Sequence, residues 1–195
     1  TSGTVAKDSS GNGLDAQLIN DAAWSEGKLG GAVKLDGKKS YVQLPDLGLQ
    51  KAATIAVWVN EASLGNDSWS TALVHSDGWE LGDLHLQIPC EKGNIGAALN
   101  GAGSVDSRFT FADNLNKWVH VVFTYDLKSM SMSLYVNGKL ENTSGFREAR
   151  PINLNDIRLG SWDGNSRFFD GRVYDLRIYE KVLSAEEIAQ LASGK

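Results

Sequence analysis

The chain has 195 residues, a formal net charge of −5 at pH 7 and a single cysteine, Cys90. The length suits one β-sandwich domain spanning residues 1–195, and the mild acidity disfavours a nucleic-acid partner, which needs clustered Lys and Arg. One cysteine excludes an internal disulfide, so we expect it to pack beside a strand, and no apolar run approaches the roughly 20 residues that span a membrane.

The N-terminal part alternates glycine-rich polar loops with short apolar runs. Residues 8–13 (DSSGNG) place oxygen-bearing side chains around two glycines, which is typical of a plain turn or of a loop that binds a hard cation. Apolar and polar residues alternate in 14–18 and predict a short strand, after which Trp24 lies in a polar connection. Residues 32–36 and 41–44, joined by a glycine-containing turn, predict a hairpin.

The middle of the chain contains many short strand patterns. Residues 54–60 (TIAVWVN) are nearly continuous in apolar side chains, which is typical of a strand covered on both faces. A polar loop at 61–69 and another at 100–107 interrupt the pattern. Gly, Asp or Asn residues separate the other predicted strands, which are 71–75, 79–81, 84–88, 95–99 and 108–111.

The strongest strand pattern covers residues 118–139 (WVHVVFTYDLKSMSMSLYVNGK). Every second residue of its two halves is apolar, which is typical of a half-buried antiparallel pair. Asn137-Gly138 predicts a tight hairpin turn, because both residues tolerate positive φ. Such a hairpin cannot bury its apolar face alone, so the rest of the chain must supply an opposing sheet.

The C-terminal segment carries the last strands and the only helical signal. Residues 157–160 and 171–179 predict strands. Ser184 and Glu187 have the spacing of a capping box, and Gly194 lies where the short helix that follows would end. About a dozen short strands with one helix predict a two-sheet sandwich rather than a parallel α/β fold.

Several segments together are similar to one family. They are 8–13 (DSSGNG), 30–37 (GGAVKLDG), 54–59 (TIAVWV), 118–126 (WVHVVFTYD), 134–139 (LYVNGK), 159–160 (LG), 169–183 (FDGRVYDLRIYEKVL) and 184–188 (SAEEI). In this order they resemble the laminin G-like jelly roll domains of the concanavalin A-like lectin/glucanase superfamily. The resemblance spans nearly the whole chain and implies an all-β fold, a two-sheet antiparallel jelly roll β-sandwich with a short C-terminal helix.

The resemblance also implies a structural calcium ion, with Asp8, Asn12 and Asp175 as its ligands in this chain. Calcium takes about six to eight oxygen ligands, and close N- and C-terminal strands would bring Asp175 to the first loop. The family often has two acidic residues where this chain has Tyr174-Asp175, so only the second acid is present. In the alternative interpretation, Asp8 and Asn12 hydrogen-bond their own turn and Asp175 pairs with an arginine.

Aromatic residues outside the strand cores predict a carbohydrate site. Sugars present apolar ring faces and many hydroxyls, so a site needs an exposed aromatic ring beside carboxylate, amide or guanidinium groups. The candidates are Trp69, Trp79 and Trp162, with His75, His85, Gln87, Arg108, Asp163 and Arg167 as polar residues near them in the sequence. For each tryptophan the alternative is a loop anchor in the core. Trp58 and Trp118, inside strands, are predicted to be core residues.

Motifs for zinc binding and for catalysis are not found in the sequence. The three histidines, His75, His85 and His120, lack the paired spacing of a zinc site. Glucanases of the superfamily carry E-x-D-x-E or E-x-D-x-x-E on one strand, and no such string occurs. Glu80 and Asp83, three residues apart, would point to opposite faces of a regular strand.

The sequence therefore predicts a non-catalytic carbohydrate-binding module that binds a poly- or oligosaccharide. The resemblance implies that it is part of a larger, secreted or cell-surface protein that carries other domains, and we expect it to be a monomer. One alternative is a protein-interaction or adhesion domain without a glycan ligand, because fold does not determine function. A glycoside hydrolase is the third alternative.

Overall fold

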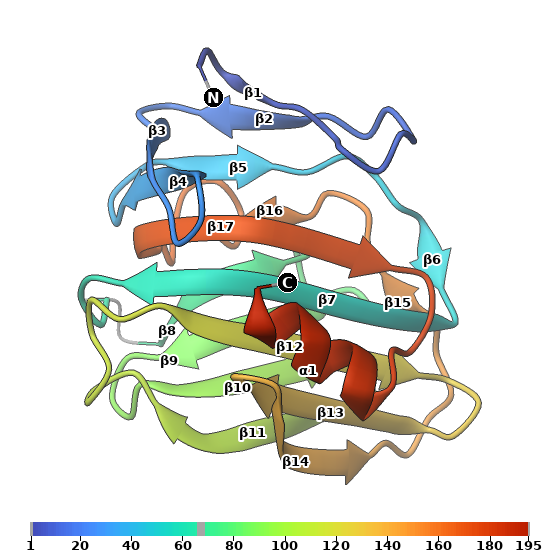
Figure 1. Ribbon diagram of the computed structural model, residues 1–195. Helices are drawn as coiled ribbons and strands as arrows, with labels where there is room; N and C mark the ends of the chain where they lie inside the picture. Colours follow the sequence, from blue (N-terminus) through green and yellow to red (C-terminus); the bar gives the residue numbers. More distant parts are fainter. Residues whose placement is uncertain (1, 66–68, 195) are drawn as a thin grey trace.

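The computed structural model describes residues 2–65 and 69–194. In these residues two large antiparallel sheets pack face to face (Figure 1). The eight-stranded sheet has the order β1 (Val5–Ala6), β2 (Ala16–Ile19), β5 (Tyr41–Gln43), β16 (Arg158–Leu159), β8 (Ser70–His75), β9 (Leu84–Pro89), β10 (Asn94–Leu99) and β11 (Gly103–Thr110). The seven-stranded sheet has the order β14 (Lys139–Gly145), β13 (Ser131–Val136), β12 (Val119–Asp126), β7 (Ala52–Glu61), β17 (Asp170–Tyr179), β4 (Gly31–Asp36) and β3 (Ala23–Glu26).

Smaller elements complete the fold. Strands β6 (Leu49–Gln50) and β15 (Ile152–Asn153) pair as a two-stranded ribbon, and helix α1 (Ala185–Ser193) lies on the outer face of the seven-stranded sheet (Figure 1). The predicted all-β class with a short C-terminal helix is confirmed. Among the described residues, no helix has the length and apolar character that crossing a membrane requires.

The predicted hairpin forms between β12 and β13, in register from Val121–Val136 to Asp126–Ser131. Asn137 and Gly138 take φ of 49° and 79° and form the tight turn that leads from β13 to β14. The prediction of a half-buried pair was wrong for β12, because both of its faces are buried. Its inner face meets the other sheet, and on its outer face Val122 packs against Ile188 of α1. Strand β7 is covered on both faces, as predicted.

The boundaries of α1 follow from its caps. The Ser184 hydroxyl accepts the Glu187 N–H at 3.2 Å, and the Glu187 carboxylate accepts the Ser184 N–H at 2.7 Å. Gly194 ends the helix with a φ of 70°. These contacts confirm the predicted capping box and stop signal.

Replacing the capping residue should loosen this helix. We expect Ser184→Ala to lower the free energy of unfolding by about 1 kcal/mol, because the Glu187 N–H loses its acceptor. Urea denaturation measures the change. Ser193→Ala is the matched control, since its hydroxyl bonds the Gln190 carbonyl in the last turn and caps no N–H group; an equal loss in both variants would contradict the capping argument.

Residues 32–36 and 41–44 do not form the predicted hairpin. Strand β4 pairs with β3 and β17, whereas β5 pairs with β2 and β16 in the other sheet. The Asp36 carboxylate accepts the backbone N–H groups of Lys38, Lys39 and Ser40, each at 3.0 Å. These bonds stabilise a corner that carries the chain from one sheet to the other.

Four further parts of the strand prediction were wrong. Trp24 lies in β3 rather than in a connection, and its indole N–H donates to the Gly3 carbonyl at 2.9 Å. Strand β11 begins inside the predicted loop 100–107, and β14 was missed. Residues 79–81 belong to a turn, not a strand.

Candidate functional site

Two loops beside strands β8 and β9 of the eight-stranded sheet bring aromatic and cationic side chains together. Trp79 lies in the β8–β9 loop, and Trp162 and Arg167 lie in the β16–β17 loop. The two indole rings meet edge to face with centroids 5.6 Å apart, and the Arg167 guanidinium lies 4.3 Å from the centre of the Trp162 ring. His85 lies 4.5 Å from the Trp79 ring. We call these four residues the tryptophan cluster.

Strand pairing explains why these loops meet. Strands β8 and β9 pair with His75 opposite His85, and Arg158 of β16 also lies opposite His75. Strands β8 and β16 are antiparallel, so the β16–β17 loop begins beside the middle of β8, where the Gly160 N–H donates to the Leu73 carbonyl at 3.0 Å, and it ends there too, where the Ala72 N–H donates to the Arg167 carbonyl at 2.9 Å. Between these two points the loop reaches the β8–β9 loop. The Trp162 indole N–H donates to the Gly78 carbonyl at 3.3 Å, which ties one loop to the other.

Arg158 strengthens this connection. Its guanidinium pairs with Asp77 at 3.2 Å and donates to the Trp162 carbonyl at 3.3 Å. The Arg158 side chain is only 12% exposed, so water screens the ion pair less than at an open surface. Sequence reasoning missed both residues, because a short strand and a turn carried no aromatic signal.

The buried carboxylate of Asp83 holds the loop that presents Trp79. It accepts the Glu80 backbone N–H at 2.7 Å and an amide N–H of Asn153 at 2.8 Å. Glu80 and Asp83 are therefore joined through the backbone of a turn. In the structure, Asp83 positions the loop.

Asp163 has a similar role in the second loop. Its carboxylate accepts the Asn165 N–H at 2.8 Å and the Ser166 hydroxyl at 2.9 Å. Burial raises the pKa of Asp163, but these hydrogen bonds outweigh it and hold the pKa below its ordinary value. The turn they stabilise ends at Arg167, which takes a left-handed φ of 53°.

Two buried imidazoles lie beneath the exposed ring. His75 and His85 have ring centroids 4.8 Å apart, and both side chains are buried. Within the described ranges, neither His75 nitrogen has a hydrogen-bond partner. Burial lowers the pKa of His85, and the Arg167 charge lowers it further. Both imidazoles are therefore neutral at pH 7, and Arg167 supplies the positive charge of the cluster.

The other predicted sugar-binding residues lie elsewhere on the sheet. Trp69 precedes β8 and the Trp79 loop follows it, so the strand separates the two by roughly 20 Å. Trp69 is 71% exposed and lines a separate hollow with Glu91, Lys92, Asn94 and Asp106. Arg108 lies at the same end, because Asn94 pairs with Thr110. Gln87 accepts the Ser70 hydroxyl at 2.7 Å.

The two tryptophans predicted to be core residues have different outcomes. Trp58 is buried, as predicted, and lies on the outer face of the seven-stranded sheet with the Lys28 ammonium 3.7 Å from its ring centre. Trp118 is only half-buried and packs beside Tyr174, so its assignment to the core was wrong.

A family model described as the concanavalin A-like lectin/glucanases superfamily matches residues 36–189. The chain belongs to this superfamily. The resemblance seen in the sequence is thus confirmed. No curated protein matches the sequence significantly.

Solved structures with the same fold are known. Domain 4 of AbnA, a GH43 extracellular arabinanase from Geobacillus stearothermophilus in complex with arabinotriose, has a TM-score of 0.73 at 21% identity and covers 95% of this chain and 92% of that one. The binding domain of Paraclostridial Mosquitocidal Protein 1 has a TM-score of 0.80 at 18% identity, over 100% and 50% of the two chains. The botulinum neurotoxin serotype D ligand binding domain, in complex with N-acetylneuraminic acid, has a TM-score of 0.73 at 20% identity, over 97% and 48%.

These likenesses confirm the predicted jelly roll β-sandwich. At such low identities they show the fold alone. The chain spans about half the length of the two toxin domains and nearly all of the arabinanase domain.

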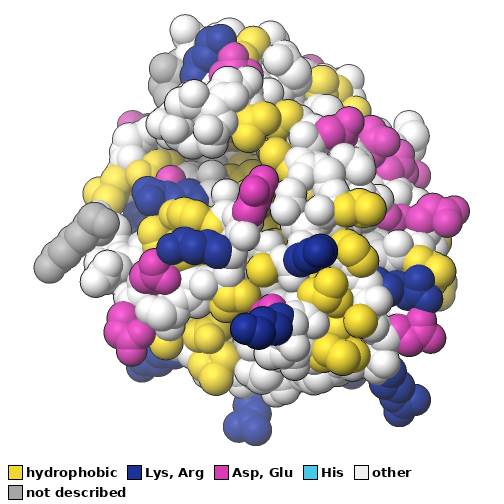
Figure 2. Space-filling view, turned by 90° about the vertical axis from the view of Figure 1, so that its right-hand side faces the viewer, with side chains coloured by type: hydrophobic (Ala, Val, Ile, Leu, Met, Phe, Trp, Pro, Cys, Tyr) yellow, Lys and Arg dark blue, Asp and Glu magenta, His cyan; other side chains and the backbone are white. Residues whose placement is uncertain are grey.

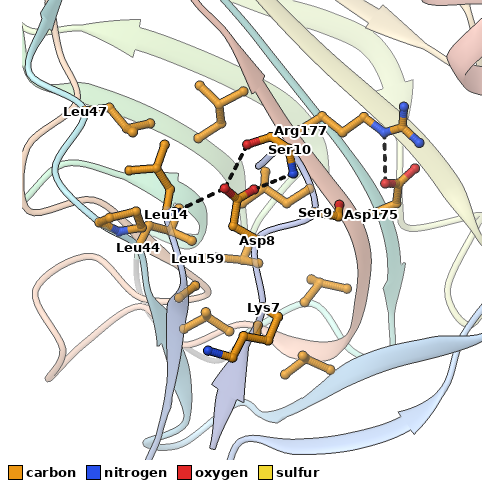
Figure 3. Close-up of a pocket in the computed structure, with 18 of the residues that line it drawn as sticks. Lys7, Asp8, Ser9, Ser10, Leu14, Leu44, Leu47, Leu159, Asp175 and Arg177 are labelled. Carbon is orange, nitrogen blue, oxygen red and sulfur yellow. Dashed lines mark hydrogen bonds and ion pairs between the residues drawn. The ribbon is translucent and has the colours of Figure 1, made fainter. Parts of the chain in front are cut away.

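The three predicted calcium ligands, Asp8, Asn12 and Asp175, line one cavity, and Figure 3 shows Asp8 and Asp175 there. The Asp8 carboxylate accepts the N–H groups of Ser10, Asn12 and Leu14 and the Ser10 hydroxyl. These hydrogen bonds, with those from Ser10 the largest, lower the pKa of Asp8 to about 2. Asp175 pairs with Arg177 at 2.9 Å, as the dashed line in Figure 3 marks.

As arranged, these residues do not fit a calcium ion, because their carboxylates already face N–H and O–H donors. In the described ranges no group of three or more His, Cys, Asp or Glu residues could hold a metal ion. The contacts match the alternative interpretation of the sequence, in which Asp8 bonds its own turn and Asp175 pairs with an arginine. Structural calcium stays an untested prediction of the sequence.

Thermal melting with and without EDTA separates the two interpretations. Because Asp8 and Asp175 are engaged within the chain, we expect chelation to leave the melting midpoint unchanged. An ion present at about 100 times its Kd would add about 2.7 kcal/mol, a shift of several degrees. A fall of that size, reversed by added calcium and not by magnesium, would establish the ion.

Proposed function

We propose that the chain is a non-catalytic carbohydrate-binding domain and that the tryptophan cluster holds the saccharide. The observation that carries this proposal is Trp79, a large ring left 58% exposed and held edge-on by Trp162. An isolated exposed tryptophan is common on surfaces, but this ring is braced by a second indole, an imidazole and a guanidinium. Bracing fixes its orientation and lowers the entropy lost on binding.

The chemistry of the cluster suits a sugar. The C–H face of a pyranose or furanose ring can stack on the exposed Trp79 indole, which removes apolar surface from water. Arg167, 6.0 Å from the Trp79 ring centre, can donate to ring hydroxyls or to a carboxylate. The complexes of AbnA domain 4 with arabinotriose and of the serotype D domain with N-acetylneuraminic acid support this proposal.

The same proposal includes the setting of the domain. We infer that it is a monomeric part of a larger secreted or cell-surface protein and that it brings other domains to a polysaccharide. Support comes from AbnA, in which a domain of this fold belongs to an extracellular arabinanase. A protein-interaction or adhesion domain without a glycan ligand is the competing function.

Affinity electrophoresis on polysaccharide gels and a glycan array test the binding. We expect retardation by at least one polysaccharide, including arabinan and sialylated glycans in the panel, and no product release from matching oligosaccharides. No binding to any polysaccharide on the gels or to any glycan on the array would reject the proposal and favour the protein-interaction domain. Product release would reject its non-catalytic part.

A further inference from the structure

A cavity of about 960 Å³ lies between the two sheets near the N-terminal strands. Its walls come from β1, β2, β5 and β16 of the eight-stranded sheet and from β3, β4 and β17 of the seven-stranded sheet. Figure 2 shows hydrophobic side chains around a hollow on this side of the molecule. The volume is at the upper end of the range of organic ligand sites, about 300–1,000 Å³.

Small and apolar side chains leave this space open. Ala6, Ala16 and Gly31 lie where the walls of a filled core would carry larger groups. Apolar residues form the interior, which includes Trp24, Val33, Val42, Leu44, Leu159, Val173 and Ile178. Leu44 and Leu159 point into the space in Figure 3. Wall atoms that face empty space lack van der Waals contacts on that side, and an apolar ligand in the cavity would supply them.

Charged groups surround the mouth, and all but Glu180, which accepts only an amide N–H of Gln50 at 3.4 Å, are engaged by their own loop or by an opposite charge. Lys7 pairs with Asp15 at 2.5 Å, and Arg177 pairs with Asp175. The Asp8 carboxylate already accepts hydrogen bonds from Ser10, Asn12 and Leu14 of its own loop. A negatively charged ligand head would therefore meet no uncompensated cation at this mouth, and the Glu180 carboxylate would repel it. Hydroxyl and amide groups for an uncharged head are present there on Ser9, Asn12, Tyr174 and Tyr179.

We propose that this cavity binds the alkyl chain of an uncharged amphiphile, with the apolar chain between the sheets and a hydroxyl head between the Asp8 loop and β17. The bulge of β17 shapes the mouth, because its register shifts between Tyr174 and Arg177 and Asp175 takes a φ of 52°. The site is separate from the tryptophan cluster and independent of the proposed carbohydrate function.

Binding of the uncharged fluorophore N-phenyl-1-naphthylamine tests the site. We expect the probe to bind and 1-decanol to displace it. Decanoate, which has the same chain with an anionic head, should compete at least about tenfold less well, because desolvating an unpaired charge is costly. No probe binding, equal displacement by 1-decanol and decanoate, or stronger displacement by decylamine, which could pair with Glu180, would overturn the proposal.

Two variants locate the probe. Ala16→Phe and Leu44→Trp place bulk in the cavity, and each should weaken probe binding by about tenfold or more. Ala16→Phe should keep its saccharide retention, and Trp79→Ala should keep its probe binding, so failure of one site is distinguishable from failure of the other. Unchanged probe binding in both filled variants would overturn the location.

Energy transfer from tryptophan to the probe locates the probe without placing a larger side chain in the cavity. Trp24 lines the space, so Trp24→Phe should reduce tryptophan-excited probe emission more than Trp79→Phe does. The two substitutions remove the same chromophore from different ends of the molecule. An equal reduction by both would overturn the assignment to this cavity.

Discussion

The variant Trp79→Ala is expected to bind polysaccharide roughly 30-fold more weakly than the wild type, with an unchanged melting midpoint. A central aromatic residue at a binding hot spot contributes on the order of 2 kcal/mol, and each 1.4 kcal/mol is tenfold in Kd. Because the ring is 58% exposed, its removal leaves no cavity in the core. Affinity electrophoresis and a parallel thermal melt measure the two effects.

Trp69→Ala is the matched control, because Trp69 is 71% exposed at the opposite end of β8. We expect it to bind polysaccharide as the wild type does. If Trp69→Ala alone lost polysaccharide binding, the binding site would be the hollow beside β9 and β10 rather than the tryptophan cluster. Full binding by Trp69→Ala, Trp79→Ala and Trp162→Ala would show that no predicted tryptophan carries the recognition.

Local patterns predicted the fold best. The β12–β13 hairpin, the β13–β14 turn at Asn137-Gly138, the buried strand β7 and the cap of α1 at Ser184 and Glu187 each depend on neighbours within a few residues. A period of two does not say in which sheet a strand pairs. Strands β4 and β5 were therefore assigned to one hairpin, although the Asp36 corner sends them to different sheets.

The candidate site required contacts that sequence patterns do not contain. Trp79, Trp162 and Arg167 were predicted from their residue types, but their proximity depends on β16 pairing with β8. The same sheet order separates Trp69 and Arg108 from them. Arg158 and Asp77, which tie the two loops, lie in a two-residue strand and a turn that gave no strong pattern.

Glu61 was also missed, because it was assigned to a polar loop. It is the last residue of β7, and alternation along the strand points its side chain inward, like those of Val57 and Val59. It is 0% exposed, and within the described ranges neither carboxylate oxygen has a hydrogen-bond partner. Burial raises the pKa of Glu61 to about 8, and the charge of Asp170 adds to this effect.

The raised pKa makes stability depend on pH in a defined direction. Between the ordinary value of 4.5 and about 8, the folded state keeps the Glu61 proton while the unfolded chain releases it. Its contribution to stability is therefore complete below pH 4.5 and is lost as pH rises through 8. Buried His75, His85 and His120 have lowered pKa values and act oppositely, since their contribution grows as pH rises toward 6.5.

The difference between Glu61→Gln and the wild type isolates the carboxylate, because the histidines contribute equally to both proteins. The amide is an uncharged isostere of the protonated acid, so the two should be similarly stable at pH 5. At pH 9 the variant should be more stable by on the order of 3 kcal/mol, because it has no proton to lose. Urea denaturation at both pH values measures this, with exposed Glu91→Gln as the control. A stability difference that is the same at pH 5 and pH 9 would contradict this prediction. It would show that Glu61 is ionised in the folded protein and paired with another group, because losing the proton from an unpaired buried carboxylate must lower the free energy of unfolding.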